Sequence, residues 1–121
     1  MVSGDLAGHF ESHPHAARLR DATIRAIAAA GPSTTRTTRS QISFRRRRGF
    51  AWIWAPQQYL GSRSAPVALA LAFPRHVRSR RWKEVVEPRP GWFMHHLEVR
   101  RVSDVDQQVR RWIKAAWEAA A

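Results

Sequence analysis

The chain has 121 residues, 44% of them apolar and six of them Trp, so it can bury the core of one domain, and wholesale disorder is excluded. It has no Cys, which excludes a disulfide framework, a thiolate metal site and a cysteine nucleophile. Its 21 Lys and Arg against 9 Asp and Glu give a net charge of +12, which favours an anionic partner, and its longest strongly apolar run, 67–73, is too short to span a membrane.

The amino terminus, MVSGDLAGHF, lacks the basic start and the apolar run of a signal peptide, so we expect a cytoplasmic protein. We expect a single domain over residues 1–121, in which residues 1–11 are flexible. The sequence does not indicate the oligomeric state.

A first helix is predicted to open near Ser12 and Pro14, a cap candidate and a first-turn proline, and to end at Gly31-Pro32. Its core-facing positions recur at helical spacing on one stripe: Leu19, Thr23, Ile27 and Ala30, with Ile24 beside them. We therefore expect a helix with one face on the core.

After this helix the sequence pattern changes to an alternation with a period of two residues, which is typical of β-strands. Residues 34–39 predict a polar edge strand, and residues 41–44 and 50–55 predict a hairpin whose tip consists of Arg45, Arg46, Arg47, Arg48 and Gly49. Gly49 is expected to supply a left-handed residue. We expect Phe50, Trp52 and Trp54 to face the helices, because three large rings in one row suit the core of a small domain.

Residues 48–53 also have a superficial likeness to the aromatic strand of an RNA-recognition motif, in which exposed rings stack on bases. Ala55 stands where that motif has an aromatic residue, and the order of helices and strands differs from that fold. We therefore favour burial of these rings.

Two further strands are predicted. Residues 67–73 alternate bulky apolar residues with Ala68, Ala70 and Ala72, which is typical of a central strand with one bulky and one thin face. Residues 93–102 have a core face that includes His95 and a wetter face that includes His96. The connections over 57–65 and 75–91 are long, and such loops are often functional.

The last helix is predicted from Ser103 as cap, with Asp104 and Asp106 in the first turn. Its apolar stripe is Val105, Val109, Trp112, Ile113, Ala116 and Trp117. The order helix, strands, helix predicts an α+β two-layer sandwich with an amino-terminal helix, an antiparallel sheet of four to five strands and a carboxy-terminal helix.

Three stretches carry a family resemblance: Gly31-Pro32 through SQISFRRRRGFAWIWAP, then SRRWKEVVEPRPGWFMHHLEV, and the closing SDVDQQVRRWIKAAWEAA. They span nearly the whole chain, which resembles the bacterial family called domain of unknown function 5655. The resemblance implies a compact α+β domain, found alone or attached to other domains. It implies no catalytic residues.

The excess positive charge lies in the middle of the chain. Residues 1–33 and 103–121 are neutral, residues 34–56 carry +6, and residues 75–91 carry +4. A tip of four adjacent guanidiniums suits an anion such as a phosphate backbone, and the same run is also typical of a solvated loop in an Arg-rich chain. The candidate anion-binding residues are Arg45, Arg46, Arg47, Arg48, Arg78, Arg80, Arg81 and Lys83.

Four rings are candidates for stacking or for lining a pocket: Trp82, Trp92, His95 and His96. Anchoring of the loop is the favoured role of Trp82, and a hydrogen-bonded core position is favoured for His95. Adjacent histidines on a strand point to opposite faces, so they do not suit one metal ion, and we expect no metal or other cofactor.

These features favour a non-catalytic accessory module that binds nucleic acid or another polyanion through the arginine tip and the basic 75–91 loop. One alternative is a pocket or enzyme for a small anionic molecule that uses His95, Lys83 and Arg. Another is a protein-interaction module. A polyanion needs cations spread along a surface, whereas a small ligand needs them to converge in one cavity.

Overall fold

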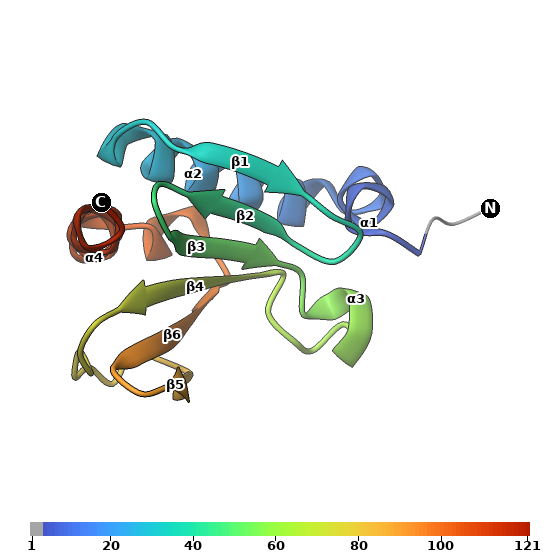
Figure 1. Ribbon diagram of the computed structural model, residues 1–121. Helices are drawn as coiled ribbons and strands as arrows, with labels where there is room; N and C mark the ends of the chain where they lie inside the picture. The colour runs from blue at the N-terminus through green and yellow to red at the C-terminus, as the bar shows by residue number, and fades with distance from the viewer. Residues whose placement is uncertain (1–3) are drawn as a thin grey trace.

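A six-stranded antiparallel sheet forms one layer of the protein, and helices form the other (Figure 1). The computed structural model describes residues 4–121. The sheet has the order β1-β2-β3-β4-β6-β5. The α+β class and the two layers are as expected, and the sheet has six strands where four to five were predicted.

The strands follow the predicted segments with one addition. Their bounds are β1 Thr34–Thr37, β2 Ile42–Arg45, β3 Gly49–Trp54, β4 Val67–Phe73, β5 Glu84–Arg89 and β6 Trp92–Val99. The apolar strand β4 lies between β3 and β6 and is buried throughout, which confirms its central position.

Strand β5 lies inside the 75–91 segment that was predicted to be a loop. Its sequence, EVVEPR, contains a proline and shows little alternation of apolar and polar residues. Both features fit an edge strand, in which five of the six residues are exposed. It pairs with β6 through a turn at Pro90-Gly91, in which Gly91 has a φ of +81°. This hairpin explains the unusual length of the predicted loop.

The long amino-terminal helix α2 spans Pro14–Ala30 with Pro14 in its first turn, and its predicted stripe is buried. A short helix, α1, Leu6–Ser12, precedes it, with Leu6 and Phe10 buried. Most of the segment 1–11, which was expected to be flexible, thus lies in this helix, and residues 1–3 lie outside the described part of the chain. A third helix, α3, spans Gln57–Leu60 in the predicted 57–65 connection.

The carboxy-terminal helix α4 spans Gln107–Ala119 and packs on α2, β3 and β4. Its cap is Asp106, whose side chain accepts from the backbone N–H of Val109, and not Ser103 as predicted. Ser103 belongs to a single 3₁₀ turn, η1, Val102–Asp104. The predicted stripe is otherwise confirmed: Val105, Val109, Ile113 and Ala116 are buried, and Trp112 and Trp117 are half-buried.

The expected orientation of the tryptophans on β3 is wrong. Phe44 pairs with Ala51, whereas the next residue, Arg45, pairs with Gly49, so Phe50 is an extra residue in a β-bulge. The bulge breaks the alternation. Phe50 and Ala51 are both fully buried toward the helices, and Trp52 and Trp54 lie on the opposite face of the sheet, half-buried.

Candidate functional site: an alanine-floored trough

The face of the sheet opposite α2 and α4 carries a trough, which we call the alanine trough. Its floor is the thin face of β4, where Ala68, Ala70 and Ala72 project between larger neighbours. Trp52 and Trp54 of β3 form one wall, and Met94, His96 and Glu98 of β6 form the other. Because neighbouring strands are about 4.8 Å apart, the two walls stand on strands about 10 Å apart.

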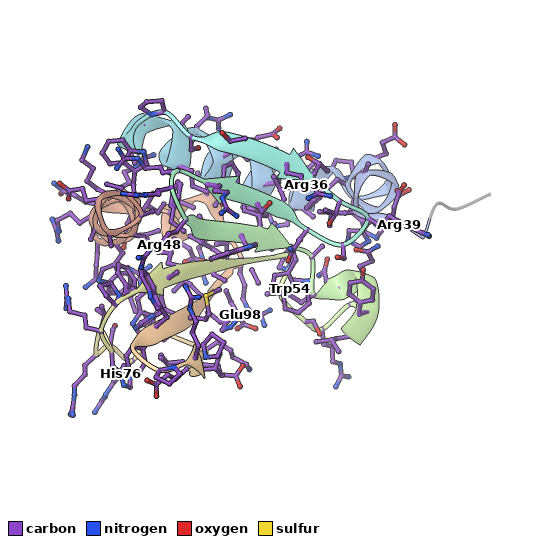
Figure 2. All side chains as sticks on the ribbon, in the orientation of Figure 1. Arg36, Arg39, Arg48, Trp54, His76 and Glu98 are labelled. Carbon is purple, nitrogen blue, oxygen red and sulfur yellow. The ribbon has the colours of Figure 1, made fainter. Side chains whose placement is uncertain are left out.

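The cross-strand register defines two slots in the trough. Trp52 lies across Ala70 from His96, and Trp54 lies across Ala68 from Glu98. Trp54 and Glu98 are both labelled in Figure 2. The middle of the trough is an open cavity of about 300 Å³, lined by Ser40, Gln41, Trp52, Trp54, Tyr59, Ala70, Met94 and His96. An empty space between flat side chains suits a planar ligand.

Three arginines gather at one end of the trough, which we call the arginine corner. Arg45 and Arg48 of the hairpin tip and Arg89 of β5 line a hollow of about 240 Å³ there with Trp52, Met94 and Trp92. The Arg48 guanidinium lies 4.7 Å and that of Arg89 5.9 Å from the ring centre of Trp92. Among the described residues that line this corner, none is acidic.

The other end of the trough is a cavity of about 410 Å³ beside α3, which we call the α3 pocket. Trp54 and Leu60 give it apolar walls. Its rim is charged and mixed in sign, with Arg63, Lys83, Glu84, His96, Glu98 and Arg100. The trough therefore has cations at both ends, and carboxylates at the α3 end.

The four arginines of the tip differ in what they contact. The Arg46 guanidinium is stacked 3.6 Å from the ring centre of Trp117 and donates to the Trp117 carbonyl oxygen at 2.9 Å. The side chains of Arg45, Arg47 and Arg48 are exposed. Gly49 has a negative φ, which corrects its predicted left-handed role, and a Cβ atom there would lie 2.7 Å from the Trp52 ring.

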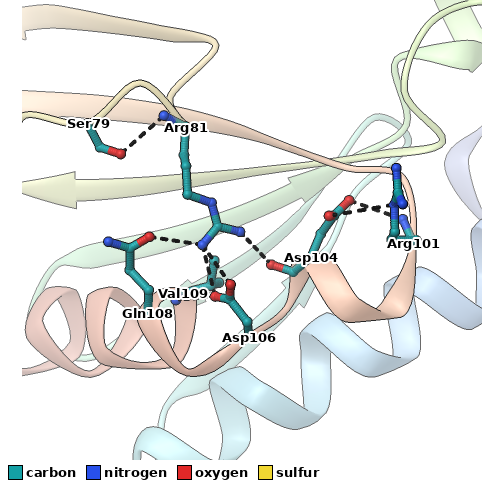
Figure 3. A network of polar contacts seen from close by, with 7 residues as sticks. All are labelled: Ser79, Arg81, Arg101, Asp104, Asp106, Gln108 and Val109. Atoms are coloured by element: carbon teal, nitrogen blue, oxygen red, sulfur yellow. Dashed lines mark hydrogen bonds and ion pairs between the residues drawn. The ribbon is translucent and has the colours of Figure 1, made fainter.

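Arg81 holds the 75–83 segment on the start of α4 (Figure 3). One of its guanidinium nitrogens donates to both carboxylate oxygens of Asp106 at 2.9 Å, and the other donates to the Asp104 carbonyl oxygen at 3.0 Å. The hydrogen bond from Arg81 lowers the pKa of Asp106. Arg78, Arg80 and Lys83 are exposed, and of these three Lys83 lines the α3 pocket.

His95 is fully buried on the helix side of β6, and both of its ring nitrogens are hydrogen-bonded. The Val77 N–H donates to Nε2 at 2.9 Å, so the proton of the neutral ring is on Nδ1, 3.2 Å from the Phe93 carbonyl oxygen. Burial lowers the pKa of His95. Trp82 is also buried and donates from Nε1 to the Val77 carbonyl oxygen at 2.9 Å. Both rings anchor the 75–83 segment.

The candidate residues thus fall into three groups. The trough brings together Arg45, Arg48, Trp92, Lys83 and His96, whereas Arg46, Arg81, Trp82 and His95 have partners elsewhere. Arg47, Arg78 and Arg80 are exposed outside the trough, and Arg80 lines a separate cavity of about 490 Å³ with Arg81, Trp82 and Lys83. The residues missed by sequence reasoning are Trp52, Trp54, Arg63, Arg89, Met94, Glu98 and Arg100. The run of three alternating alanines on β4 was the signal that could have located the trough, because a thin face flanked by large side chains leaves a depression.

Residues 4–121 lack two further features. No helix there combines the length and apolar character that a membrane-crossing helix needs. No group of three or more His, Asp or Glu side chains in the same residues is placed to hold a metal ion.

The chain matches a known protein family. The model of the family described as domain of unknown function (DUF5655) matches residues 8–120, nearly the whole chain, so the chain belongs to this family, as the sequence resemblance implied. Neither the curated proteins nor the solved structures include a match to it.

Proposed function

We propose that this member of the DUF5655 family is a non-catalytic module that binds single-stranded nucleic acid in the alanine trough. The observation that carries the proposal is the combination of Trp52 and Trp54, on the sheet face opposite α2 and α4, with the three arginines of the adjoining corner. Bases stack on aromatic rings whatever their sequence, and guanidiniums bind phosphates.

The spacing of the rings favours a single strand over a duplex. Trp52 and Trp54 are two residues apart on one strand, which puts their side chains about 7 Å apart on the same face. Successive bases in a duplex strand are about 3.4 Å apart and are stacked on one another. Adjacent bases can each meet a ring only when the strand is extended and its bases are unstacked.

The distribution of charge also supports the trough over the hairpin tip alone. Arg46 is engaged by Trp117 and Arg81 by Asp106, which removes one free cation from the tip and one from the 75–83 loop, where Arg75, Arg78, Arg80 and Lys83 stay exposed. Arg45, Arg48 and Arg89 are exposed and adjoin the rings. Phosphates bound there would leave their bases over the trough.

The test is fluorescence anisotropy with DNA and RNA oligonucleotides of about ten nucleotides, single- and double-stranded, over a salt series. We expect the wild type to bind single strands more tightly than duplexes, with an affinity that falls steeply as salt increases. Replacing Trp52 and Trp54 by Ala should weaken binding by about 1–3 kcal/mol per lost stack without changing the salt slope.

Charge is tested with two matched triple variants. Arg45, Arg48 and Arg89 replaced by Gln should reduce the log-log salt slope by up to about 2, because each phosphate contact on a single strand contributes about 0.7. Arg18, Arg25 and Arg110 are exposed on α2 and α4, and their replacement by Gln removes the same charge from the other side of the domain. Equal effects of the two triple variants, or no binding at about 50 mM salt, would contradict the proposal.

A further inference from the structure

The α3 end of the trough differs from its middle in the chemistry of its wall. In the middle slot Trp52 faces His96, so a planar ligand meets two rings and no acidic group. In the slot at the α3 end Trp54 lies across Ala68 from Glu98, a carboxylate. The first slot suits a flat ring of any kind. In the second slot the two carboxylate oxygens of Glu98 can accept hydrogen bonds from the edge of a flat ring that stacks on Trp54.

The position of Glu98 is unusual for a surface that favours anions. The chain has only 9 acidic residues against 21 basic ones, yet Glu98 and Glu84 both line the α3 pocket. A carboxylate repels phosphate, so a group at this place must interact with another part of the ligand if a nucleic acid is bound. The exposed edge of a base is that part.

Glu98 has room for a ligand. Within residues 4–121 its ion pair joins Oε1 to a guanidinium nitrogen of Arg100 at 3.5 Å, which is longer than the usual 2.7–2.9 Å of a charge-assisted hydrogen bond. A carboxylate accepts about four hydrogen bonds. Its side chain is 30% exposed, and it borders the cavity of about 410 Å³.

We propose that this slot selects guanine, with the base stacked on Trp54 and its Watson–Crick edge donating to Glu98. Guanine is the base whose Watson–Crick edge places two donors side by side, N1–H and the 2-amino group, which match the two oxygens of a carboxylate. Adenine offers one amino donor beside an acceptor nitrogen. Thymine offers one N–H between two carbonyl oxygens, which the carboxylate repels.

The cations of the same pocket suit the phosphate of that nucleotide. Arg63, Lys83 and Arg100 line the α3 pocket with the two carboxylates, so the pocket keeps a net positive charge with a charged rim and a Trp54 wall. Such a pocket can attract a nucleotide while its carboxylate discriminates among bases. This inference rests on the proposed function and adds one sequence preference to it.

The experiment measures the binding of four single-stranded oligonucleotides of about ten residues by anisotropy. One is all thymidine, and the others carry one central deoxyguanosine, deoxyinosine or deoxyadenosine. Inosine keeps N1–H and lacks the 2-amino group. We expect the affinities to fall in the order guanine, inosine, adenine, with about a tenfold difference between the first and the last.

The variant Glu98→Gln keeps the shape of the side chain and loses one of its two acceptors and its charge. It should reduce the preference for guanine over adenine to less than about threefold, while its affinity for oligothymidine is equal to or greater than that of the wild type. A damaged fold would weaken both. Glu118→Gln, at an exposed position of α4, is the matched control and should keep the full preference.

Equal binding of the guanine, inosine and adenine oligonucleotides, or an unchanged preference in Glu98→Gln, would overturn this inference and leave sequence-tolerant binding in place. Failure of the wild type to bind any of the four, oligothymidine included, would overturn the proposed function and this inference together.

Discussion

The guanidinium of Arg46 lies 3.6 Å from the ring centre of Trp117 and donates to the carbonyl oxygen of the same residue at 2.9 Å. The hairpin tip is thereby joined to the end of α4. The backbone N–H groups of Arg47 and Arg48 add two hydrogen bonds to the Ala120 carbonyl oxygen, at 3.0 and 3.2 Å. These contacts fix the tip, and with it the position of Arg45 and Arg48 at the arginine corner.

Arg46→Ala should therefore reduce the free energy of unfolding by about 1–3 kcal/mol, because it removes a cation–π contact and a hydrogen bond to a carbonyl at a helix end. Arg47→Ala removes the same charge from an exposed side chain and should change the free energy of unfolding by less than about 0.5 kcal/mol. Urea denaturation of the two variants measures both values. Equal effects would show that the tip is not held by Arg46.

Gly31 is needed where α2 ends against Trp117. Its φ is +150°, and a Cβ atom there would lie 2.3 Å from the Trp117 ring, whose Nε1 donates to the Pro32 carbonyl oxygen. Gly31→Ala should lower the free energy of unfolding by about 1–3 kcal/mol through overpacking, beyond any backbone strain. In a Trp117→Ala background the same substitution should cost clearly less. A double-mutant cycle with purely additive effects would contradict this close approach.

The sequence was informative where the period was regular and misleading where an irregularity intervened. The buried stripe of α2 and the alternation of β4 were predicted because the environment repeats at a fixed interval, every three to four residues in a helix and every second residue in a strand. One extra residue, Phe50, reversed the facing of Trp52 and Trp54, and a bulge of this kind leaves no clear mark in a single sequence. The trough was therefore not predicted, because Trp52 and Trp54, which form one of its walls, were assigned to the core.

Charge counting located the basic segments but not the partners of their members. Arg46 and Arg81 are alike in sequence to Arg45 and Arg80, and they are distinguished by Trp117 and Asp106, which lie far away along the chain. Such contacts depend on tertiary packing, which composition does not encode.

His95 predicts a pH dependence of stability. Burial lowers its pKa in the folded state below the ordinary value of about 6.5, which applies to the unfolded chain. Its contribution is therefore complete above pH 6.5 and falls as the pH decreases from about 6.5 toward the folded pKa, because the unfolded state binds the proton first. The slope from this one group is at most about 1.4 kcal/mol per pH unit.

The measurement is urea denaturation of the wild type and His95→Gln between about pH 7.5 and 5. The variant should be less stable at the higher pH and should lose less stability on acidification. His9, whose pKa burial also lowers, contributes in the same direction, so adding His9→Gln should flatten the profile further. A slope in His95→Gln as steep as that of the wild type would contradict a buried neutral ring.

Substitutions of Trp82 and Trp52 should have different effects, the first mainly on the free energy of unfolding and the second mainly on the binding of single strands. Trp82 is buried against Trp112, with ring centres 4.2 Å apart, so Trp82→Ala should cost about 3–5 kcal/mol of unfolding free energy. Trp52 is half-buried at the trough, so Trp52→Ala should cost less than half as much and should weaken binding of single strands. Thermal melts and anisotropy on the same samples make the comparison. The reverse pattern would assign Trp82 to the binding surface.

The location of binding is tested most directly by titrating the isotope-labelled protein with oligothymidine and following backbone amide and indole N–H signals by NMR. The trough predicts that the largest shifts occur at β3, β4 and β6, with the indole signals of Trp52 and Trp54 among them, while the amides of α2 and α4 stay in place. Shifts confined to the helices or to residues 75–81, or no shifts at all at about 50 mM salt, would contradict binding of single-stranded nucleic acid in the trough.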